Sequence, residues 1–225
     1  MPLFRHNAVY ERLTGSALAA WAEIPPAIAS DCMNRSQAMD AAIKPLAPGT
    51  RLTGQARTVA CMVGDNSAIH AATRLIGPGD VLVIAAGDYA ETALWGGLLT
   101  QAVLSRGAAG VVVDGAVRDI AEIREAGFPC FASAAVPAGP HKGFGGTIDG
   151  VIACAGCAVA PGDIILGDDD GIAVVPLARA TAVLAECHAK LAQEEAALER
   201  LRQGTLLADQ MDIPEPHRST DIKFH

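Results

Sequence analysis

Apolar runs alternate with helix-like segments through the middle of the chain. The apolar runs cover residues 81–86, 110–113 and 130–134, and helical patterns cover about 92–106 and 119–126 between them. Short buried strands that alternate with helices are typical of βαβ units around a largely parallel sheet. The hydrophobic pattern therefore predicts an α/β fold.

More elements are predicted on both sides of this region. Residues 51–63 form a strand-like run after a helical segment at 24–43, and residues 147–159 and 164–175 contain further strand patterns. Glycine and proline residues separate the last two segments, as expected for a turn. We expect these segments to add strands to the domain.

The pattern changes near residue 177. From there to residue 203 apolar residues recur at helical spacing among Glu, Lys, Arg and Gln, and Gly204 follows. This spacing predicts a long amphipathic helix that ends at the glycine. We therefore predict an α/β domain over residues 1–176, followed by a helix and tail over residues 177–225 that pack on a neighbouring subunit.

Composition narrows the class of protein. The chain has 225 residues, 51% of them hydrophobic and 19% charged, which is typical of a globular protein with a sizeable core. A net charge of −8 disfavours nucleic acid as a partner, because phosphate binding needs a basic surface. With no apolar run near the ~20 residues of a membrane span and no signal-peptide pattern, we expect a cytoplasmic protein without a membrane partner.

Six cysteines are scattered through mostly apolar surroundings. Cys154 and Cys157 form a CxxC motif, but the sequence has neither a second CxxC nor the histidine pair that would complete a zinc site. We interpret the cysteines as small core residues, with a redox role for the CxxC pair as the alternative.

Candidate chemistry follows the apolar run 110–113. Arg118 and Asp119 come shortly after it, at the carboxyl end of a predicted strand, where α/β proteins usually bind ligands. The planar guanidinium of Arg118 suits a carboxylate, and the oxygens of Asp119 suit Mg²⁺ or Mn²⁺. The alternative is that Asp119 only caps a helix that begins at Ile120, while Arg118 pairs with a surface acid.

Gly96 and Gly97 are a second candidate feature. Glycines at the start of a helix let a ligand approach the backbone N–H groups, although they also serve close packing between helices. Neither a GxSxG motif nor HExxH-like spacing is present, which disfavours serine and zinc hydrolases.

Eight short motifs occur in a fixed order along most of the chain. They are SD at 30–31, GQARTV at 54–59, GDN at 64–66, PGDVLV at 78–83, GGLL at 96–99, DGAVRD at 114–119, PGD at 161–163 and DDDGIAVVP at 168–176. In these motifs the chain resembles the RraA-like family, over roughly residues 29–204. The resemblance implies a single-domain α-β-β-α sandwich with a central mixed sheet and a long C-terminal helix.

The resemblance also implies two possible functions. One branch of the family comprises metal-dependent class II pyruvate aldolases that cleave 4-hydroxy-4-methyl-2-oxoglutarate and 4-carboxy-4-hydroxy-2-oxoadipate, often with oxaloacetate decarboxylase activity. The other comprises non-catalytic regulators that bind a ribonuclease. The acid of the Arg-Asp pair and the long C-terminal helix favour the aldolase, and oxaloacetate decarboxylation as the main activity is a further alternative.

Site residues are carried over from the aldolase branch by position. Asp119 is expected to hold Mg²⁺ or Mn²⁺, Arg118 to hold the 2-oxo acid substrate, and the backbone of Gly96, Gly97, Leu98 and Leu99 to bind its pyruvate part. Glu194 matches an acid that reaches into the neighbouring subunit's site, with Glu195 as an adjacent alternative and a solvated acidic surface as the simpler interpretation. A site shared between subunits requires an oligomer, and the resemblance implies a homotrimer or homohexamer.

One position departs from the aldolase pattern. The aldolases tend to carry an acid at the second position of the Gly96–Gly97 pair, where this chain has Gly97. In the aldolases this acid helps to order a metal-bound water, so its absence bears on the step in which the substrate's proton is transferred. Asp88 or Glu91 is a candidate for a replacement carboxylate.

Overall fold

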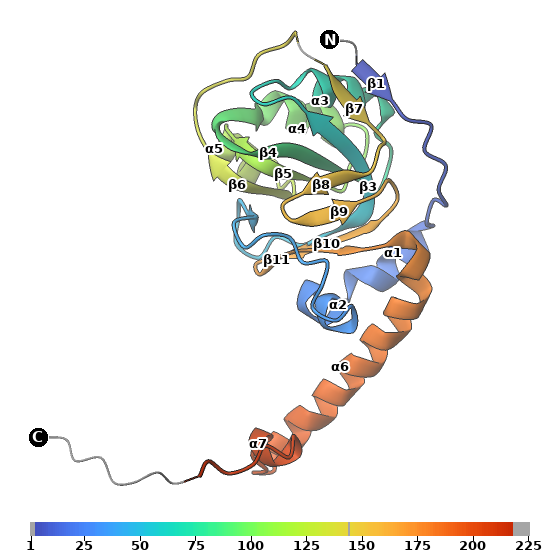
Figure 1. The fold of residues 1–225 in the computed structure, drawn as a ribbon, viewed down its shortest axis with the longest axis vertical. Coiled ribbons are helices and arrows are strands. Elements are labelled where there is room, and N and C mark those ends of the chain that lie inside the picture. The colour runs from blue at the N-terminus through green and yellow to red at the C-terminus, as the bar shows by residue number, and fades with distance from the viewer. Residues whose placement is uncertain (1–2, 144, 218–225) are drawn as a thin grey trace, which may run out of the picture. The chain divides into compact units, whose positions relative to one another are not determined.

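The computed structural model describes residues 3–143 and 145–217, and it contains two compact units, Met1–Cys187 and His188–His225. Four parallel strands lie side by side at the centre of the first unit in the order β3, β4, β5, β6 (Figure 1). Helices α3, α4 and α5 connect them in turn. The bounds are β3 Leu52–Cys61, α3 Ser67–Ala72, β4 Asp80–Trp95, α4 Gly97–Leu104, β5 Gly110–Val117, α5 Ile120–Glu125 and β6 Cys130–Ala135.

Shorter strands extend this parallel centre into a mixed sheet. β2 pairs antiparallel with β6 at one edge, while β7 and β10 pair antiparallel with opposite ends of β3. β1 adds to β7, β11 to β10, and β8 with β9 forms a separate hairpin. The bounds are β1 Leu3–Arg5, β2 Lys44–Pro45, β7 Gly146–Ile148, β8 Ile152–Cys154, β9 Cys157–Val159, β10 Ile164–Asp168 and β11 Gly171–Val175.

Each face of the sheet is covered by its own apolar core. Val111 and Val113 point to the face where α3, α4 and α5 contribute Ile69, Val103 and Ile123. Val112 points to the opposite face, because successive side chains of a strand alternate. There the second core includes Ile152, Cys154, Cys157 and Val159 of the β8–β9 hairpin and Ile172 and Val174 of β11. Beyond this layer α2 (Pro26–Cys32) contacts β11, which completes the predicted α-β-β-α order.

Two predicted helices differ from the structure. Within 24–43 the helix ends at Cys32, and the buried side chains of Met39 and Ile43, which produced the apolar pattern, belong to an irregular segment. A separate helix, α1, precedes it at Gly15–Ala22. The helix predicted from residue 92 begins only at Gly97, because β4 continues to Trp95 and still pairs with β5 there.

The long C-terminal helix is confirmed. A 3₁₀ turn at Leu177–Arg179 leads into α6, Ala180–Arg202, and Gly204 follows with the positive φ of 93° that favours glycine after a helix. In the second unit α7, Leu207–Gln210, is tied to α6 by a 2.8 Å hydrogen bond from Arg200 Nε to Gln210 Oε1. Residues 218–225 of the predicted tail lie outside the described residues. No helix in the described part of the chain is long and apolar enough to cross a membrane.

Candidate functional site

Arg118 and Asp119 lie at the carboxyl end of β5, in the wall of a pocket of about 160 Å³. The backbone N–H of Arg118 donates to the carbonyl of Trp95 at 3.0 Å, which joins the end of β5 to the end of β4. Residues from four separate segments share the pocket. The polar side chains among them are Asn66, His70, Arg118, Asp119 and Lys142.

Asp119 stands at the N-cap position of α5, but its side chain makes no capping hydrogen bond. Its backbone is left-handed, with φ 58° and ψ 39°, a conformation that costs free energy in a residue other than glycine. Asp119 Oδ2 instead accepts a hydrogen bond from the backbone N–H of Gly97 at 3.0 Å. The capping alternative is therefore wrong, because the carboxylate is turned toward α4 and the pocket.

Arg118 offers an accessible guanidinium to the pocket. Its side chain is 43% exposed, and Nε lies 3.6 Å from Asp119 Oδ2. Within residues 3–143 and 145–217 it forms no ion pair with any other acid, so it does not pair with a separate surface carboxylate. A Cβ built on Gly139 would lie 2.7 Å from one terminal nitrogen of Arg118, so the loop is closely packed on the guanidinium.

The glycine pair brings the start of α4 against these two residues. A Cβ on Gly96 would lie 2.6 Å from Asp119 Oδ2 and 3.2 Å from Arg118 Cγ. The first N–H groups of a helix have no intrahelical partner and attract anions. Leu98 is exposed beside the pocket, whereas the side chain of Leu99 is buried in the core. The glycines thus provide both close packing and an approach to backbone donors.

Three pocket residues were missed from the sequence. Asn66 follows β3 in the GDN motif, His70 lies on α3, and Lys142 belongs to the loop before β7. Asn66 could have been predicted from its position, because it follows a strand that is parallel to β5. The carboxyl ends of parallel strands lie at the same edge of a sheet, so Asn66 is expected near Arg118 and Asp119. Partial burial, and then the charge of Lys142, lower the pKa of His70, so its imidazole is neutral at pH 7.

Asn66 carries an unusual hydrogen-bonding state. It is 4% exposed, and its Nδ2 donates to the carbonyl of Leu94 at 3.0 Å. Its Oδ1 is buried without a hydrogen-bond partner among the described residues. Because an unpaired buried acceptor costs about 1–3 kcal/mol, such an atom in a pocket is a place for a donor on a ligand.

The acids near Gly97 differ from those considered from the sequence. Asp88 lines a separate pocket with Asp40 and Asp114 rather than the pocket of Arg118, and Glu91 is exposed on β4. Instead, a Cβ built on Gly97 would overlap Oε2 of Glu122. Glu122 was missed because it lies in the first turn of α5, where an acid is usual at any helix start.

Glu194 lies in the second unit, on α6. It is exposed and forms an i,i+4 ion pair with Lys190 at 3.5 Å. Glu195 is exposed as well. A role for either acid in a neighbouring subunit stays a prediction.

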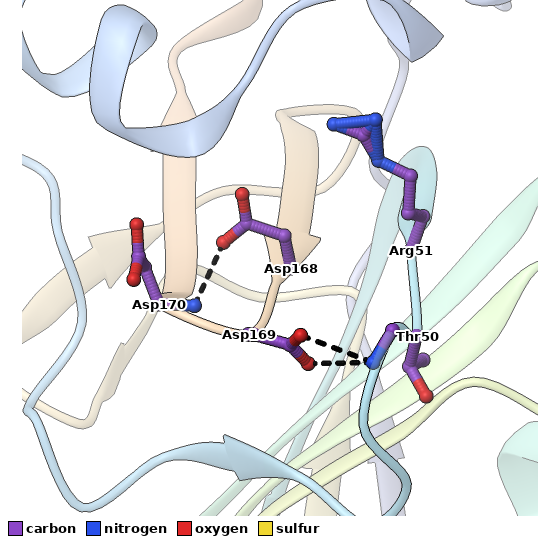
Figure 2. Close-up of a pocket in the computed structure, with 6 residues that line it drawn as sticks. Thr50, Arg51, Asp168, Asp169 and Asp170 are labelled. Carbon is purple, nitrogen blue, oxygen red and sulfur yellow. Dashed lines mark hydrogen bonds between the residues drawn. The ribbon is translucent and has the colours of Figure 1, made fainter.

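A larger hollow of about 290 Å³ lies at the β10–β11 turn. Asp169 accepts hydrogen bonds from the backbone N–H of Gly49 at 2.8 and 3.0 Å, and Asp168 accepts one from the backbone N–H of Asp170 at 2.9 Å. Figure 2 shows how Asp168, Asp169 and Asp170 lie in this turn. These carboxylates hold two turns together. The acidic run therefore has a structural explanation, and the smaller pocket is the better candidate for chemistry.

The CxxC motif also has a structural explanation. Cys154 and Cys157 are paired residues of the β8–β9 hairpin, and Ala155 and Gly156 form its turn with φ of 45° and 78°. Both thiols are free, and burial raises the pKa of each, which disfavours the reactive thiolate.

A cation and an acid at the carboxyl end of a central parallel strand, beside a helix that opens with glycine, are typical of α/β proteins that bind small anionic ligands. The model of the RraA-like family, described as Aldolase/RraA, matches residues 26–174. The chain belongs to this family.

Among its relatives are proteins named as aldolases and a protein described as an RNase inhibitor family member. A Halalkalibacterium halodurans protein provisionally named 4-hydroxy-4-methyl-2-oxoglutarate aldolase is 37% identical over 173 residues, 77% of this chain and 82% of the relative. The 4-hydroxy-4-methyl-2-oxoglutarate aldolase of Thermus thermophilus is 35% identical over 65% of this chain and 89% of its own. The solved structure of Streptomyces coelicolor RraAS2, described as an unusual member of the RNase ES inhibitor RraA family, matches with TM-score 0.76 and 28% identity, covering 84% and 100% of the two chains.

Proposed function

We propose that this protein is a divalent-metal-dependent class II pyruvate aldolase that cleaves a 4-hydroxy-2-oxo dicarboxylic acid of the 4-hydroxy-4-methyl-2-oxoglutarate type. The observation that carries the proposal is the convergence of Arg118, Asp119 and the start of α4 on one pocket. The names of the relatives from Halalkalibacterium halodurans and Thermus thermophilus support the same substrate class.

The donor set fits a hard cation. No group of three or more His, Cys, Asp or Glu side chains suitable for a metal occurs among residues 3–143 and 145–217, which fits zinc poorly. Mg²⁺ is usually held by one or two carboxylates together with its substrate. Asp119 meets this requirement, because only its Oδ2 accepts a hydrogen bond from the described part of the chain. A bound Mg²⁺ or Mn²⁺ would act as a Lewis acid for the 2-oxo group.

The reaction places clear demands on the protein. The C3–C4 bond breaks, its electron pair forms the enolate of pyruvate, and the 4-hydroxyl loses its proton as C4 becomes a carbonyl. Arg118 binds the substrate carboxylate through charge-assisted hydrogen bonds, and the free N–H groups at the start of α4 hold the pyruvate part. In this proposal a water held by the carboxylate of Glu194 of the partner subunit takes the hydroxyl proton and then returns a proton to C3 of the enolate.

The same binding mode accounts for a side activity on oxaloacetate. Loss of CO₂ from its C4 also leaves the enolate of pyruvate, so Arg118 and the α4 N–H groups hold the same part of both substrates. The proposal includes a homotrimer or homohexamer, since it draws an acid from a second subunit. Size-exclusion chromatography tests this part, and a stable, fully active monomer would contradict it.

Two alternatives have specific support. The likeness to the Streptomyces coelicolor structure favours a non-catalytic regulator that binds a ribonuclease, and oxaloacetate decarboxylation as the main activity needs no hydroxyl proton acceptor. The first experiment measures pyruvate release from 4-hydroxy-4-methyl-2-oxoglutarate and from oxaloacetate with lactate dehydrogenase, each with Mg²⁺, Mn²⁺ and EDTA. Metal-dependent release from the hydroxy-oxo acid is expected. Pyruvate release from oxaloacetate alone would favour the decarboxylase. No pyruvate release from either substrate would favour the regulator.

A further inference from the structure

Glu122 reaches the candidate cation site from the helix that begins directly after Asp119. It stands in the first turn of α5, three residues after Asp119, and its carboxylate extends to the start of α4. A Cβ on Gly97 would overlap Glu122 Oε2 and would lie 3.6 Å from Asp119 Cβ. The carboxylate of Glu122 therefore occupies the place that a side chain at position 97 would take.

The space beside Gly97 is limited by this neighbour and not by the backbone. The φ of Gly97 lies outside the left-handed region that favours glycine, and the residue is buried at the first position of α4. A larger residue there would meet the carboxylate of Glu122, the end of an exposed side chain that has to move to make room. Side chains at positions 97 and 122 thus compete for one space.

The two carboxylates are placed for a cation. Asp119 and Glu122 both extend to the N-terminal end of α4, where the N–H of Gly97 already binds Asp119 Oδ2 at 3.0 Å. Two negative charges close together repel each other, and one backbone donor neutralises them only in part. A divalent cation held by Asp119 would remove this repulsion.

On the basis of the proposed function, we propose that Glu122 is the second acid of the cation site. Asp119 holds the cation directly, and Glu122 is a positioning residue that accepts hydrogen bonds from the groups around it. Partners of this kind orient the ligands of a metal, and their removal costs about 10- to 100-fold in metal affinity. Glu122 thereby supplies from α5 the acid that position 97 lacks.

The test measures Mn²⁺ binding to the full-length, metal-free protein by isothermal titration calorimetry, without substrate. Glu122→Gln keeps the size of the side chain and removes its charge, so we expect about a 10- to 100-fold weaker Kd. Glu125→Gln is the matched control, because it removes the same charge from an equally exposed residue of the same helix that is not among the nearest neighbours of Gly97. Its Kd is expected to stay within about two-fold of wild type, since its charge stands three residues further along α5 from Asp119 than that of Glu122 and is largely screened.

A rescue experiment tests the shared space. Glu122→Ala should weaken Mn²⁺ binding, and adding Gly97→Asp to that variant should restore the Kd to within about five-fold of wild type, because the new carboxylate enters the vacated place. Gly97→Asp alone should be less stable than the double variant, since it overlaps Glu122. Circular dichroism and thermal unfolding show that each variant is folded.

The outcomes separate this inference from the proposed function. A wild-type protein that binds no Mn²⁺ and releases no pyruvate contradicts the proposed function itself. A wild type that binds Mn²⁺, with Glu122→Gln binding equally well or Glu125→Gln binding equally poorly, overturns the role of Glu122 alone. A double variant that regains no affinity overturns the claim that the two positions share one acidic place.

Discussion

The backbone N–H of Gly97 donates to the carboxylate of Asp119 at 3.0 Å, although the two residues begin different helices. This bond fixes the carboxylate at the pocket while Asp119 itself remains in a left-handed backbone conformation. A structural cap would instead turn back onto α5. The side chain of Asp119 therefore does not serve as the cap of α5 and is instead held toward the start of α4.

Asp119 therefore gives the sharpest test. Asp119→Asn keeps the acceptor for Gly97 and tolerates left-handed backbone, but it removes the charge, so the fold should persist. We expect metal-dependent pyruvate release to fall by more than about 100-fold, because loss of an outer-shell partner alone costs about 10- to 100-fold. The coupled assay and urea unfolding measure the two effects. A variant with normal metal-dependent activity would exclude Asp119 as the metal ligand.

Arg118→Lys tests the shape of the cation and not its charge. A lysine ammonium cannot reproduce the two parallel hydrogen bonds of a guanidinium. We expect kcat/KM for the hydroxy-oxo acid to fall about 10- to 100-fold, as for loss of a charged hydrogen bond. Arg51→Lys, in the other hollow (Figure 2), is the control and should have wild-type kinetics. Equal kinetics for both variants would argue against Arg118 as the carboxylate ligand.

Gly96→Ala should damage the site more than the fold. Its Cβ would lie 2.6 Å from Asp119 Oδ2 and 3.4 Å from Arg118 Nε, so both side chains must move. We expect at least about a 10-fold loss in kcat/KM, since small misplacements of this kind are costly. Gly143→Ala is the matched control, because a Cβ there meets nothing within 4 Å. A fully active Gly96→Ala variant would show that this close approach has no function.

Asn66→Ala tests the unpaired acceptor in the pocket. If Oδ1 accepts a hydrogen bond from the water that takes the proton of the substrate's 4-hydroxyl, its loss should lower kcat/KM for the hydroxy-oxo acid by about 10-fold. Oxaloacetate decarboxylation, whose keto substrate lacks that hydroxyl, should fall much less. Steady-state kinetics on both substrates give the ratio. An equal loss on both would assign Asn66 to the structure of the pocket, through its bond to Leu94.

Asp114→Asn should stabilise the protein at neutral pH. Burial raises the pKa of Asp114 in the folded state, and repulsion from Asp88 and Asp40 raises it further. A hydrogen bond from the N–H of Ala155 acts in the opposite direction but is weaker than the effect of burial. A raised folded pKa means that stability is present below the unfolded pKa and is lost as pH rises through the folded value.

Removing this charge should therefore raise the free energy of unfolding at pH 7 by about 0.5–2 kcal/mol. The gain should shrink as the pH falls from 7 toward 4, because the raised pKa moves protonation of wild-type Asp114 to a higher pH than that of an ordinary aspartate. Urea unfolding at both pH values measures it. A gain that is the same at the two pH values would show that the charge of Asp114 is not its cause.

The sequence predicted the parts of this protein that depend on regular patterns. Alternating apolar runs were sufficient for the parallel centre of the sheet, and Gly204 for the end of α6, because period and glycine conformation are local properties. The missed pocket residues, Asn66, His70 and Lys142, come from segments far apart in the chain. The parallel pairing of β3, β4 and β5 and the path of the loop before β7 bring them together. Such pairing between distant segments cannot be predicted from one sequence.

Position 97 shows the same limit more sharply. From the sequence, the glycine at position 97 indicates only that the acid of the aldolase pattern is missing. In the structure the carboxylate of Glu122 lies in that space. The pairing depends on the contact between α4 and α5, a tertiary relationship between residues 25 positions apart. Asp88, nearer to Gly97 in the sequence, lies in another pocket.

The irregular pairing of β4 has an evolutionary consequence. Three register shifts separate Ala85 from Trp95, so ten steps along β4 match only the three steps from Asp114 to Val117 on β5. Tyr89 and Ala93 still face Gly115 and Ala116, and the register skips the residues between these pairs. Residues 87–91 are mostly exposed, and Trp95 is again paired with β5 just before Gly96. We therefore expect that an insertion or deletion within residues 87–91 would leave Gly96 and Gly97 in place, because Trp95 remains paired with Val117. The fold thus keeps the end of β4 that leads into the pocket in register with β5, while the segment before it departs from regular pairing.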